Sequence, residues 1–228
     1  MEQDANGSTD AQDEGYDLDE IEARVLAVMV EKAFVTPDNY PMSINAITTG
    51  CNQLTGRDPV MKLSDAAVQD AVDTLVERRL VSRRDSASAR VPKFEHLVRL
   101  RHSLPPAEQA VLAMLMLRGP QTVGELRSRC ERMHRFQDVS EVEAVLEHLA
   151  DKYPPMVRTL PLAPGTKEVR HMHLMSGDDF ANQAAEGITA QSAPRGSRVA
   201  ELEEEVRRLR QQVDWLTGEF ETFRKQFE

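Results

Sequence analysis

Apolar residues return every three or four positions along the last thirty residues of the chain, in the alternation of a heptad repeat. Valines occupy the a positions and leucines the d positions, a combination that favours a two-stranded parallel coiled coil. A heptad pattern kept over four repeats is the strong form of this signal. The pattern therefore predicts a homodimer through residues 198–228. The residues of the predicted dimer seam are Val199, Leu202, Val206, Leu209, Val213, Leu216, Phe220 and Phe223.

The charged positions beside this seam are matched as well. In a parallel dimer, each g residue faces the e residue five positions further along the partner helix. Three such pairs join an arginine to a glutamate: Arg198 with Glu203, Glu205 with Arg210, and Glu219 with Arg224. A single amphipathic helix folded onto its own domain would not need these matches, so we expect self-association.

The residues before the heptads contain an internal repeat. Residues 22–29 (EARVLAVM) match residues 108–115 (EQAVLAML), and residues 68–76 share their helical spacing with residues 142–150. Each half then ends in two short β-prone segments around a polar turn. The repeat predicts two copies of one unit, each with three helices followed by a β-hairpin.

Capping residues place the elements of each half. A capping box at Asp17 and Glu20 is expected to start the first helix, which ends near Lys32. The other elements expected in the first half are helices at 43–52 and 64–79 and strands at 81–84 and 90–94. Those expected in the second half are helices opening at Pro105, at Thr122 with Glu125, and at Asp138 or Ser140, and strands at 156–160 and 169–174.

Three helices followed by a hairpin is the winged-helix plan. The predicted fold class is therefore mainly α with small β-hairpins, built as tandem winged-helix domains with a C-terminal coiled-coil helix. The expected divisions are a disordered acidic tail at 1–16, winged-helix domains at 17–101 and 102–175, a flexible linker at 176–197 and the coiled coil at 198–228.

The composition gives information about the cellular compartment of the protein and says little about its function. The 228 residues carry a net charge of −10, but residues 1–20 hold eight acids and no base, so the remainder is near neutral. The acidity is therefore a weak argument against nucleic acid as a partner. Two cysteines do not make a disulfide framework, and we find neither a signal peptide nor an apolar run of membrane-spanning length. We expect a cytoplasmic protein that does not bind membranes.

Several strings of the chain are distinctive: TPDNYPMSIN at 36–45, CNQ at 51–53, RDPVM at 57–61 with Leu63 and Ser64, and LRGPQTVGELRSR at 117–129. Together these strings resemble the YceH-like proteins of proteobacteria. The likeness covers about residues 18–175 and leaves out the acidic tail. It implies a tandem winged-helix fold and a bacterial cytosolic setting, and it supplies no activity.

The third helix of a winged helix usually reads DNA bases in the major groove. Here we expect its solvent-facing side to carry carboxylates in both halves, which phosphates repel. The positions are Asp65, Asp70, Asp73 and Glu77, with Gln69, in the first half and Glu141, Glu143, Glu147 and Asp151 in the second. Neither third helix is therefore predicted to read bases, and both are candidate docking faces for a protein partner.

The first hairpin has the opposite charge, because residues 78–101 hold eight bases and two acids. A basic wing can contact the phosphate backbone with little base readout. The predicted DNA-binding residues are Arg78, Arg79, Arg83, Arg84, Arg90 and Lys93. A second basic run consists of Arg127, Arg129, Arg132 and Arg135. The alternative is that these bases pair with acidic helices of a neighbouring repeat or of the partner chain.

No catalytic motif is present: the chain has no P-loop, dinucleotide fingerprint or nucleophile elbow. Cys130 with His134, and His171 with His173, could together supply four zinc ligands. We favour structural roles, because Cys130 suits a small core position and the spacing matches no recurrent zinc signature. We expect no enzyme activity, no catalytic residues, no metal and no cofactor.

Two functions remain open after this reasoning. One is a DNA-associated regulator that holds duplex by its wings, with the dimer increasing binding through avidity. The other is a protein-interaction adaptor similar to segregation and condensation protein B, whose paired winged helices bind protein. The usual role of the fold favours the first, and the acidic third helices favour the second. On balance the sequence narrowly favours the DNA-associated regulator, with the adaptor as the alternative.

Overall fold

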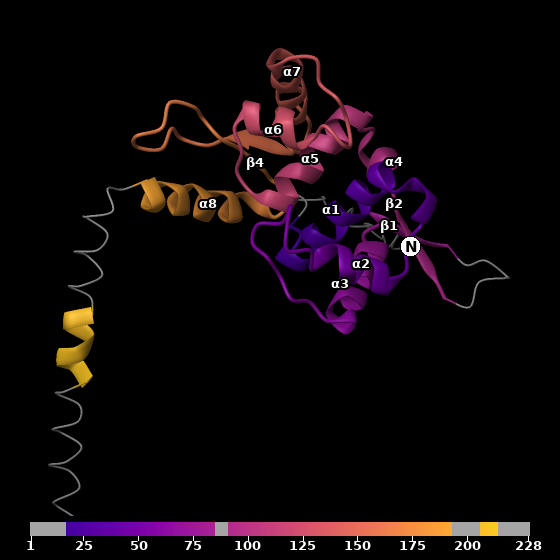
Figure 1. The fold of residues 1–228 in the computed structure, drawn as a ribbon, viewed down its shortest axis with the longest axis horizontal. Coiled ribbons are helices and arrows are strands. Elements are labelled where there is room, and N and C mark those ends of the chain that lie inside the picture. The colour runs from indigo at the N-terminus through magenta and orange to yellow at the C-terminus, as the bar shows by residue number, and fades with distance from the viewer. Residues whose placement is uncertain (1–16, 85–90, 193–205, 214–228) are drawn as a thin grey trace, which may run out of the picture. The chain divides into compact units, whose positions relative to one another are not determined.

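The computed structural model describes residues 17–84, 91–192 and 206–213 of the chain (Figure 1). The described part is mainly helical and contains two small antiparallel hairpins. It divides into two compact units, one comprising 1–162 with 168–185 and the other 163–167 with 186–228. The first unit holds both copies of the predicted repeat.

The first copy follows the predicted order closely. Its elements are α1 (Glu20–Val35), a 3-10 turn (Pro37–Asn39), α2 (Ile44–Cys51), α3 (Asp65–Glu77), β1 (Val81–Arg84), β2 (Lys93–His96) and a short α4 (Val98–His102). The predicted capping box was two residues early, because Asp19 caps α1 and Glu22 is its partner. Just before this cap, Leu18 is buried and its N–H donates to the Met175 carbonyl, 2.7 Å away.

The second copy repeats this order. Its elements are α5 (Pro106–Arg118), α6 (Val123–Arg129), α7 (Val139–Ala150), β3 (Val157–Thr159) and β4 (His171–His173). The capping box of Thr122 and Glu125 is confirmed at the start of α6, and Asp138 rather than Ser140 caps α7. Gly119 ends α5 with a φ of +69°, a conformation that glycine adopts without strain.

Each hairpin gains a third, single-residue strand that the sequence did not predict. Met42 pairs with Phe94, and Gln121 pairs with His171, each through two backbone hydrogen bonds of 2.8 and 3.0 Å. Both Met42 and Gln121 stand two residues before the second helix of their half. The two copies therefore share a hydrogen-bonding pattern as well as an order of elements.

The first helices of the two copies, α1 and α5, pack against each other at the centre of this unit (Figure 1). Residues 22–30 of α1 and 108–117 of α5 are buried without interruption. A helix that is apolar on every side has to be covered on every side. The two copies therefore share one hydrophobic core, which runs from Leu18 to Met175.

Residues 177–192, which we expected to belong to a flexible linker, form helix α8 (Gly177–Ser192). Ala181 is buried, and the guanidinium of Arg158 on β3 donates to Asp178 at 3.0 Å and to Asn182 at 2.6 Å. These contacts, together with the helix propensity of the alanines in this segment, explain why it is helical.

Only residues 206–213 of the predicted coiled coil are described, and they are helical. The seam residues Val206, Leu209 and Val213 are 45%, 48% and 59% exposed in the single chain. Such an apolar row is consistent with a covering partner, and the dimer stays a prediction. The acidic tail at 1–16, Arg90 and the other seam residues (Val199, Leu202, Leu216, Phe220 and Phe223) lie outside the described residues.

Candidate functional site

The third helices α3 and α7 present carboxylates to solvent. On α3, Val68, Val72 and Leu75 are buried in the core, and the acidic residues lie on the opposite side. The exposed acids are Asp65, Asp70, Asp73 and Glu77 on α3, and Glu141, Glu143, Glu147 and Asp151 on or next to α7. The amide of Gln69, which a base-reading helix could use, donates instead to Asp73 at 2.8 Å. These helices lack the donors that recognise base edges.

The basic residues around the first hairpin are exposed, but several of them contact carboxylates of the same chain. Arg84 lies 2.5 Å from Glu95 across the hairpin, and this hydrogen bond raises the pKa of the Arg84 guanidinium. Arg78 donates to the Asp17 carbonyl at 3.2 Å and lies 3.9 Å from the Glu22 carboxylate. These partners belong to the first copy itself, on its hairpin and at its first helix, and not to the acidic helix of a neighbouring repeat or of a partner chain.

Arg79 and Lys93 are the exposed bases of this hairpin region that remain available to phosphate. Among the described residues, their side chains make no ion pair or hydrogen bond, whereas Arg83 has an interaction partner. Arg79 also has a φ of +58°, at the turn between α3 and β1.

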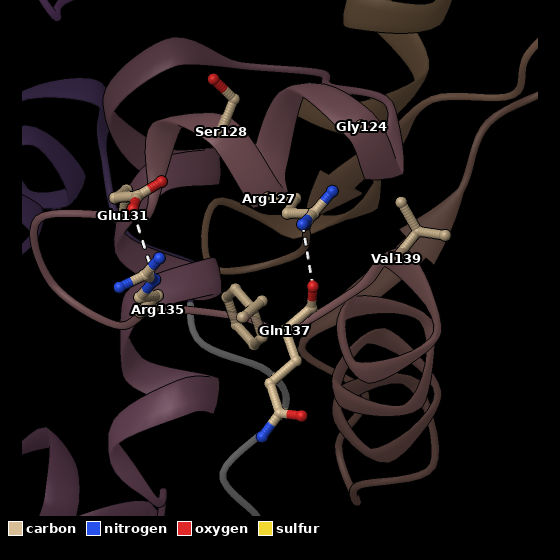
Figure 2. A pocket seen from close by; sticks show the side chains of 8 residues that line it. Gly124, Arg127, Ser128, Glu131, Arg135, Gln137 and Val139 are labelled. Carbon is tan, nitrogen blue, oxygen red and sulfur yellow. Dashed lines mark hydrogen bonds and ion pairs between the residues drawn. The ribbon is translucent and has the colours of Figure 1, made fainter.

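A hollow of about 540 Å³ lies between α6 and the start of α7 (Figure 2). Arg127 and Arg135 flank it, and each already has a partner. Figure 2 shows the Arg127 guanidinium donating to the Gln137 carbonyl, 2.8 Å away, and the Arg135 guanidinium 3.6 Å from Glu131. The N-terminus of α7 is capped by the Asp138 carboxylate, which occupies the position where a helix N-terminus would bind a phosphate. This hollow is therefore a poor anion site.

The other two arginines of the second basic run, Arg129 and Arg132, differ in exposure. Arg129 is half-buried and donates to Gln121 at 2.8 Å and to Glu125 at 3.1 Å, so it supports the start of α6. Arg170 reaches the same Glu125 at 2.7 Å. Burial alone would raise the pKa of Glu125, but its hydrogen bond to Thr122 and these two arginines lower it. Arg132 is exposed.

A groove of about 380 Å³ runs between α7 and the second hairpin. Its apolar lining comes from Val123, Leu146, Ala150, Val157 and Val169. The charged or ionisable residues of its lining are Glu143 and Glu147 of α7 and Arg158 and His171 of the hairpin.

The charges along this groove are unequal. The positive charge of Arg158 is compensated by Asp178 at 3.0 Å. Burial lowers the pKa of His171, so its ring is neutral at pH 7. The uncompensated charges of the groove are therefore the two carboxylates of Glu143 and Glu147, beside an apolar floor.

The groups proposed above as alternative zinc ligands do not form a site. Cys130 is buried, its thiol lies 3.6 Å from the Ala110 carbonyl, and burial raises its pKa to about 12. The thiolate, which is the form that binds metals or attacks carbon, is therefore scarce at neutral pH. His173 is buried, and burial lowers its pKa to about 4. Within the described ranges, no three His, Cys, Asp or Glu side chains stand close enough to hold a metal ion.

Two buried arginines that the sequence analysis did not single out organise the loop between α2 and α3. Arg57 makes a two-point contact with Glu31, with nitrogen–oxygen distances of 2.6 and 3.2 Å. Arg24 donates to the Pro59 carbonyl at 2.9 Å. The sequence did contain one sign of a buried arginine: Arg24 is a charged residue inside an otherwise apolar run on α1.

The described residues thus form a mainly helical protein with two small antiparallel hairpins. None of its described helices has both the length and the apolar character needed to cross a bilayer. The chain belongs to the family described as Protein of unknown function, DUF480, whose model matches residues 18–166. The family resemblance noted in the sequence is confirmed at this level.

Similar proteins come from several bacteria. A UPF0502 protein of Azoarcus sp. (strain BH72) is 65% identical over 221 residues, covering 96% of this chain and 97% of the relative. One from Janthinobacterium sp. (strain Marseille) is 49% identical over 206 residues, covering 90% and 89%. One from Geobacter sulfurreducens is 44% identical over 216 residues, covering 92% and 98%. The matches extend over nearly whole chains.

Proposed function

We propose that this protein is a non-enzymatic tandem winged-helix adaptor that binds a basic segment of another protein and works as a homodimer. The winged-helix assignment is supported by three helices followed by an antiparallel hairpin, in both copies. The single-residue strands at Met42 and Gln121 complete a three-stranded wing in each copy. The two domains are residues 17–101 and 102–175, and the dimer forms through the C-terminal heptads.

One observation carries the choice of a protein partner: the exposed face of each third helix is lined with carboxylates. A duplex would bring phosphates towards these faces and be repelled. A protein segment rich in Lys and Arg would be attracted, and the attraction would mainly speed association. The negative charge of these helices would therefore favour binding of a basic protein segment and oppose binding of DNA.

The groove beside α7 specifies the partner further. Its apolar lining suits the apolar side of an amphipathic helix, and helices commonly dock in grooves in this way. The carboxylates of Glu143 and Glu147 in its lining would then face Lys or Arg on the polar side of that helix. The fitting partner is a basic amphipathic helix.

The test is quantitative capture of partners by the full-length protein from nuclease-treated lysate. Reversing the groove charges with Glu143→Lys and Glu147→Lys should reduce the captured protein at least tenfold. The matched control, Asp38→Lys with Asp179→Lys, makes the same charge change at exposed positions away from the groove and from both third helices, and should retain most of it. Equal loss in both variants would mean that net charge, and not the groove, attracts the partner.

A second function, phosphate contact by the first wing, is favoured by the exposed side chains of Arg79 and Lys93. Its site would consist of Arg78, Arg79, Arg83, Arg84, Arg90 and Lys93, and the dimer would present two such wings. We place it second because Arg84 and Arg78 contact carboxylates of their own chain. Retention on duplex DNA that falls steeply with salt would support this function.

A further inference from the structure

A small cavity lies at the junction of the two repeats, among α1, the loop between α2 and α3, the end of α5, β4 and the start of α8. Its volume is about 30 Å³, which is room for one water-sized or ion-sized guest. Its walls are largely apolar and include Met61, Met116, Met172 and Phe180. The cavity is separate from the groove and from the basic wing.

Unpartnered polar atoms gather on this cavity. In the described part of the chain, six buried side-chain nitrogen or oxygen atoms have no hydrogen-bond partner. Three of the six belong to residues that line the cavity: Nε of Arg24, Nδ1 of His173 and Oγ of Ser176. Arg24 and His173 are each only 2% exposed. Buried polar atoms without partners are uncommon, so three at one small cavity point to a guest.

The charge at the cavity identifies the guest. The other nitrogens of Arg24 donate to two carbonyls, those of Pro59 at 2.9 Å and Cys51 at 3.5 Å. Its guanidinium therefore has hydrogen bonds but no carboxylate within ion-pair distance. Burial and the charge of the neighbouring Arg57 lower the pKa of Arg24, and the charges of Glu20 and Asp58 oppose this only in part. An anion would offset both effects.

The donors have the chemistry to hold an anion. Arg24 offers its Nε–H, Ser176 offers its hydroxyl hydrogen, and a neutral His173 can carry its hydrogen on Nδ1. Glu20 and Asp58 also line the cavity, and their charges attract Arg24 without forming an ion pair. Both side chains are exposed, so solvent screens their repulsion of an anion. The small volume and the apolar walls select a compact, weakly hydrated anion over a phosphate.

We propose that this cavity binds a compact monovalent anion, either a halide such as chloride or the carboxylate of a very small acid. The guest would join α1, through Arg24, to β4 and to Ser176, which directly precedes α8. It would thereby fix the start of α8 on the repeats. This site is independent of the proposed adaptor function.

The test compares thermal unfolding of the full-length protein in different sodium salts at constant ionic strength and pH 7.5. Gluconate is too large for the cavity and serves as the reference. Chloride, bromide or formate should raise the Tm in a saturable way, by about 5–10 °C when the anion is near 100 times its Kd. A rise with chloride and bromide alone identifies a halide site, and a rise with formate alone identifies a carboxylate site. An equal Tm in all four salts would overturn the proposal.

A matched pair of variants localises the effect. Ser176→Ala removes one donor with little change of volume and should weaken the anion affinity about tenfold. Ser128→Ala, at the exposed serine beside the α6–α7 hollow, should leave it unchanged. Crystals grown in bromide should show an anomalous peak within hydrogen-bond distance of Arg24. A water at that position without any anomalous signal would contradict the proposal, even if salts changed the Tm.

Discussion

Arg57 is a buried residue of the loop between α2 and α3, and its side-chain hydrogen bonds hold this loop in place. Besides Glu31, its guanidinium binds the side chain of Gln53 at 2.7 Å and the Gly50 carbonyl at 3.0 Å. Burial alone would raise the pKa of Glu31, but the hydrogen bond and charge of Arg57 lower it below its ordinary value. The buried pair is therefore ionised at neutral pH, and its geometry positions Asp58, whose N–H donates to the Leu117 carbonyl of α5.

Replacing Arg57 with methionine should destabilise the protein by about 3 kcal/mol, because Glu31 is left ionised and partly buried with Lys32, 3.3 Å away, as its remaining ion-pair partner. Urea unfolding at pH 7 measures this loss. The double variant Arg57→Met with Glu31→Leu should recover part of it, since the buried carboxylate is gone, and the recovery is incomplete because Lys32 loses its ion pair with Glu31. A single variant within 1 kcal/mol of wild type would show that the ion pair is not needed to hold the loop.

His96 predicts a pH dependence. Burial lowers its pKa to about 4, against the smaller opposing effect of Glu95, so the folded protein keeps the ring neutral. In the unfolded chain this histidine binds a proton below about pH 6.5. The contribution of His96 to the free energy of unfolding is therefore fully present above that pH and decreases as the pH falls towards 4. Between pH 7 and pH 5 this residue should cost about 2 kcal/mol of unfolding free energy.

Urea unfolding of wild type and of His96→Gln at both pH values checks this prediction. The glutamine variant should lose less stability between pH 7 and pH 5 than wild type, by roughly that amount. The same pH dependence in both proteins would show that His96 does not titrate as its burial implies.

At the scale of the element, α3 and α7 have equivalent places in the repeat but different surroundings. Both expose a row of acids, yet the groove beside α7 combines its acids with an apolar floor. The hairpin next to α3 instead carries Arg83, Arg84 and Lys93. The second copy is thus better suited to a protein partner, and any phosphate contact belongs to the first.

Changing Asp70, Asp73 and Glu77 together to Asn, Asn and Gln should leave the fold intact, within roughly 1 kcal/mol, because all three are exposed. Any duplex affinity of the first wing should rise, since three repulsive charges are gone, and its sequence preference should not change. Anisotropy with labelled duplexes of unrelated sequence measures both quantities. Loss of duplex binding in this variant would mean that α3 reads bases.

Local signals made much of this predictable from sequence. The caps at Ser43, Ser64 and Thr122 depend on residues within one helical turn, so the starts of α2, α3 and α6 follow from the sequence. The single-residue strands at Met42 and Gln121 join segments about fifty residues apart, and no local pattern reports them. Helix α8 was missed because contacts with Arg158 stabilise it.

At the scale of the whole molecule, the two copies do not have separate cores. The repeat in the sequence predicted two units, but it could not show that α1 and α5 bury each other. The groove and the junction cavity were likewise beyond sequence reasoning, because each is lined by residues from several elements. Exposure of the acidic faces was predictable, since helical periodicity alone determines it.

The shared core predicts that neither copy is stable alone. A fragment of residues 1–104 would expose the side of α1 that α5 covers, so it should lack a cooperative thermal transition. Co-expression with residues 105–228 should restore a soluble complex. Circular dichroism and size exclusion provide the measurement, and a sharp transition in the isolated fragment would show that the first copy is an independent domain.

The heptad repeat predicts the oligomeric state. A chain truncated after Ser197 should be a folded monomer, and Leu209→Asp with Leu216→Asp should have the same effect, because unpaired carboxylates in a coiled-coil seam are costly. Light scattering measures the mass of each form. A dimer that survives truncation would place the interface on the two copies of the repeat.

Photocrosslinking from two positions in living cells tests the adaptor function most directly. A benzophenone amino acid replaces Ala150, which lines the groove, or Lys93, which lies on the basic wing. The adaptor function predicts a discrete protein adduct from position 150 that disappears with Glu143→Lys and Glu147→Lys, and no nucleic-acid adduct from position 93. Nucleic acid crosslinked at position 93, with no protein adduct at position 150, would contradict it.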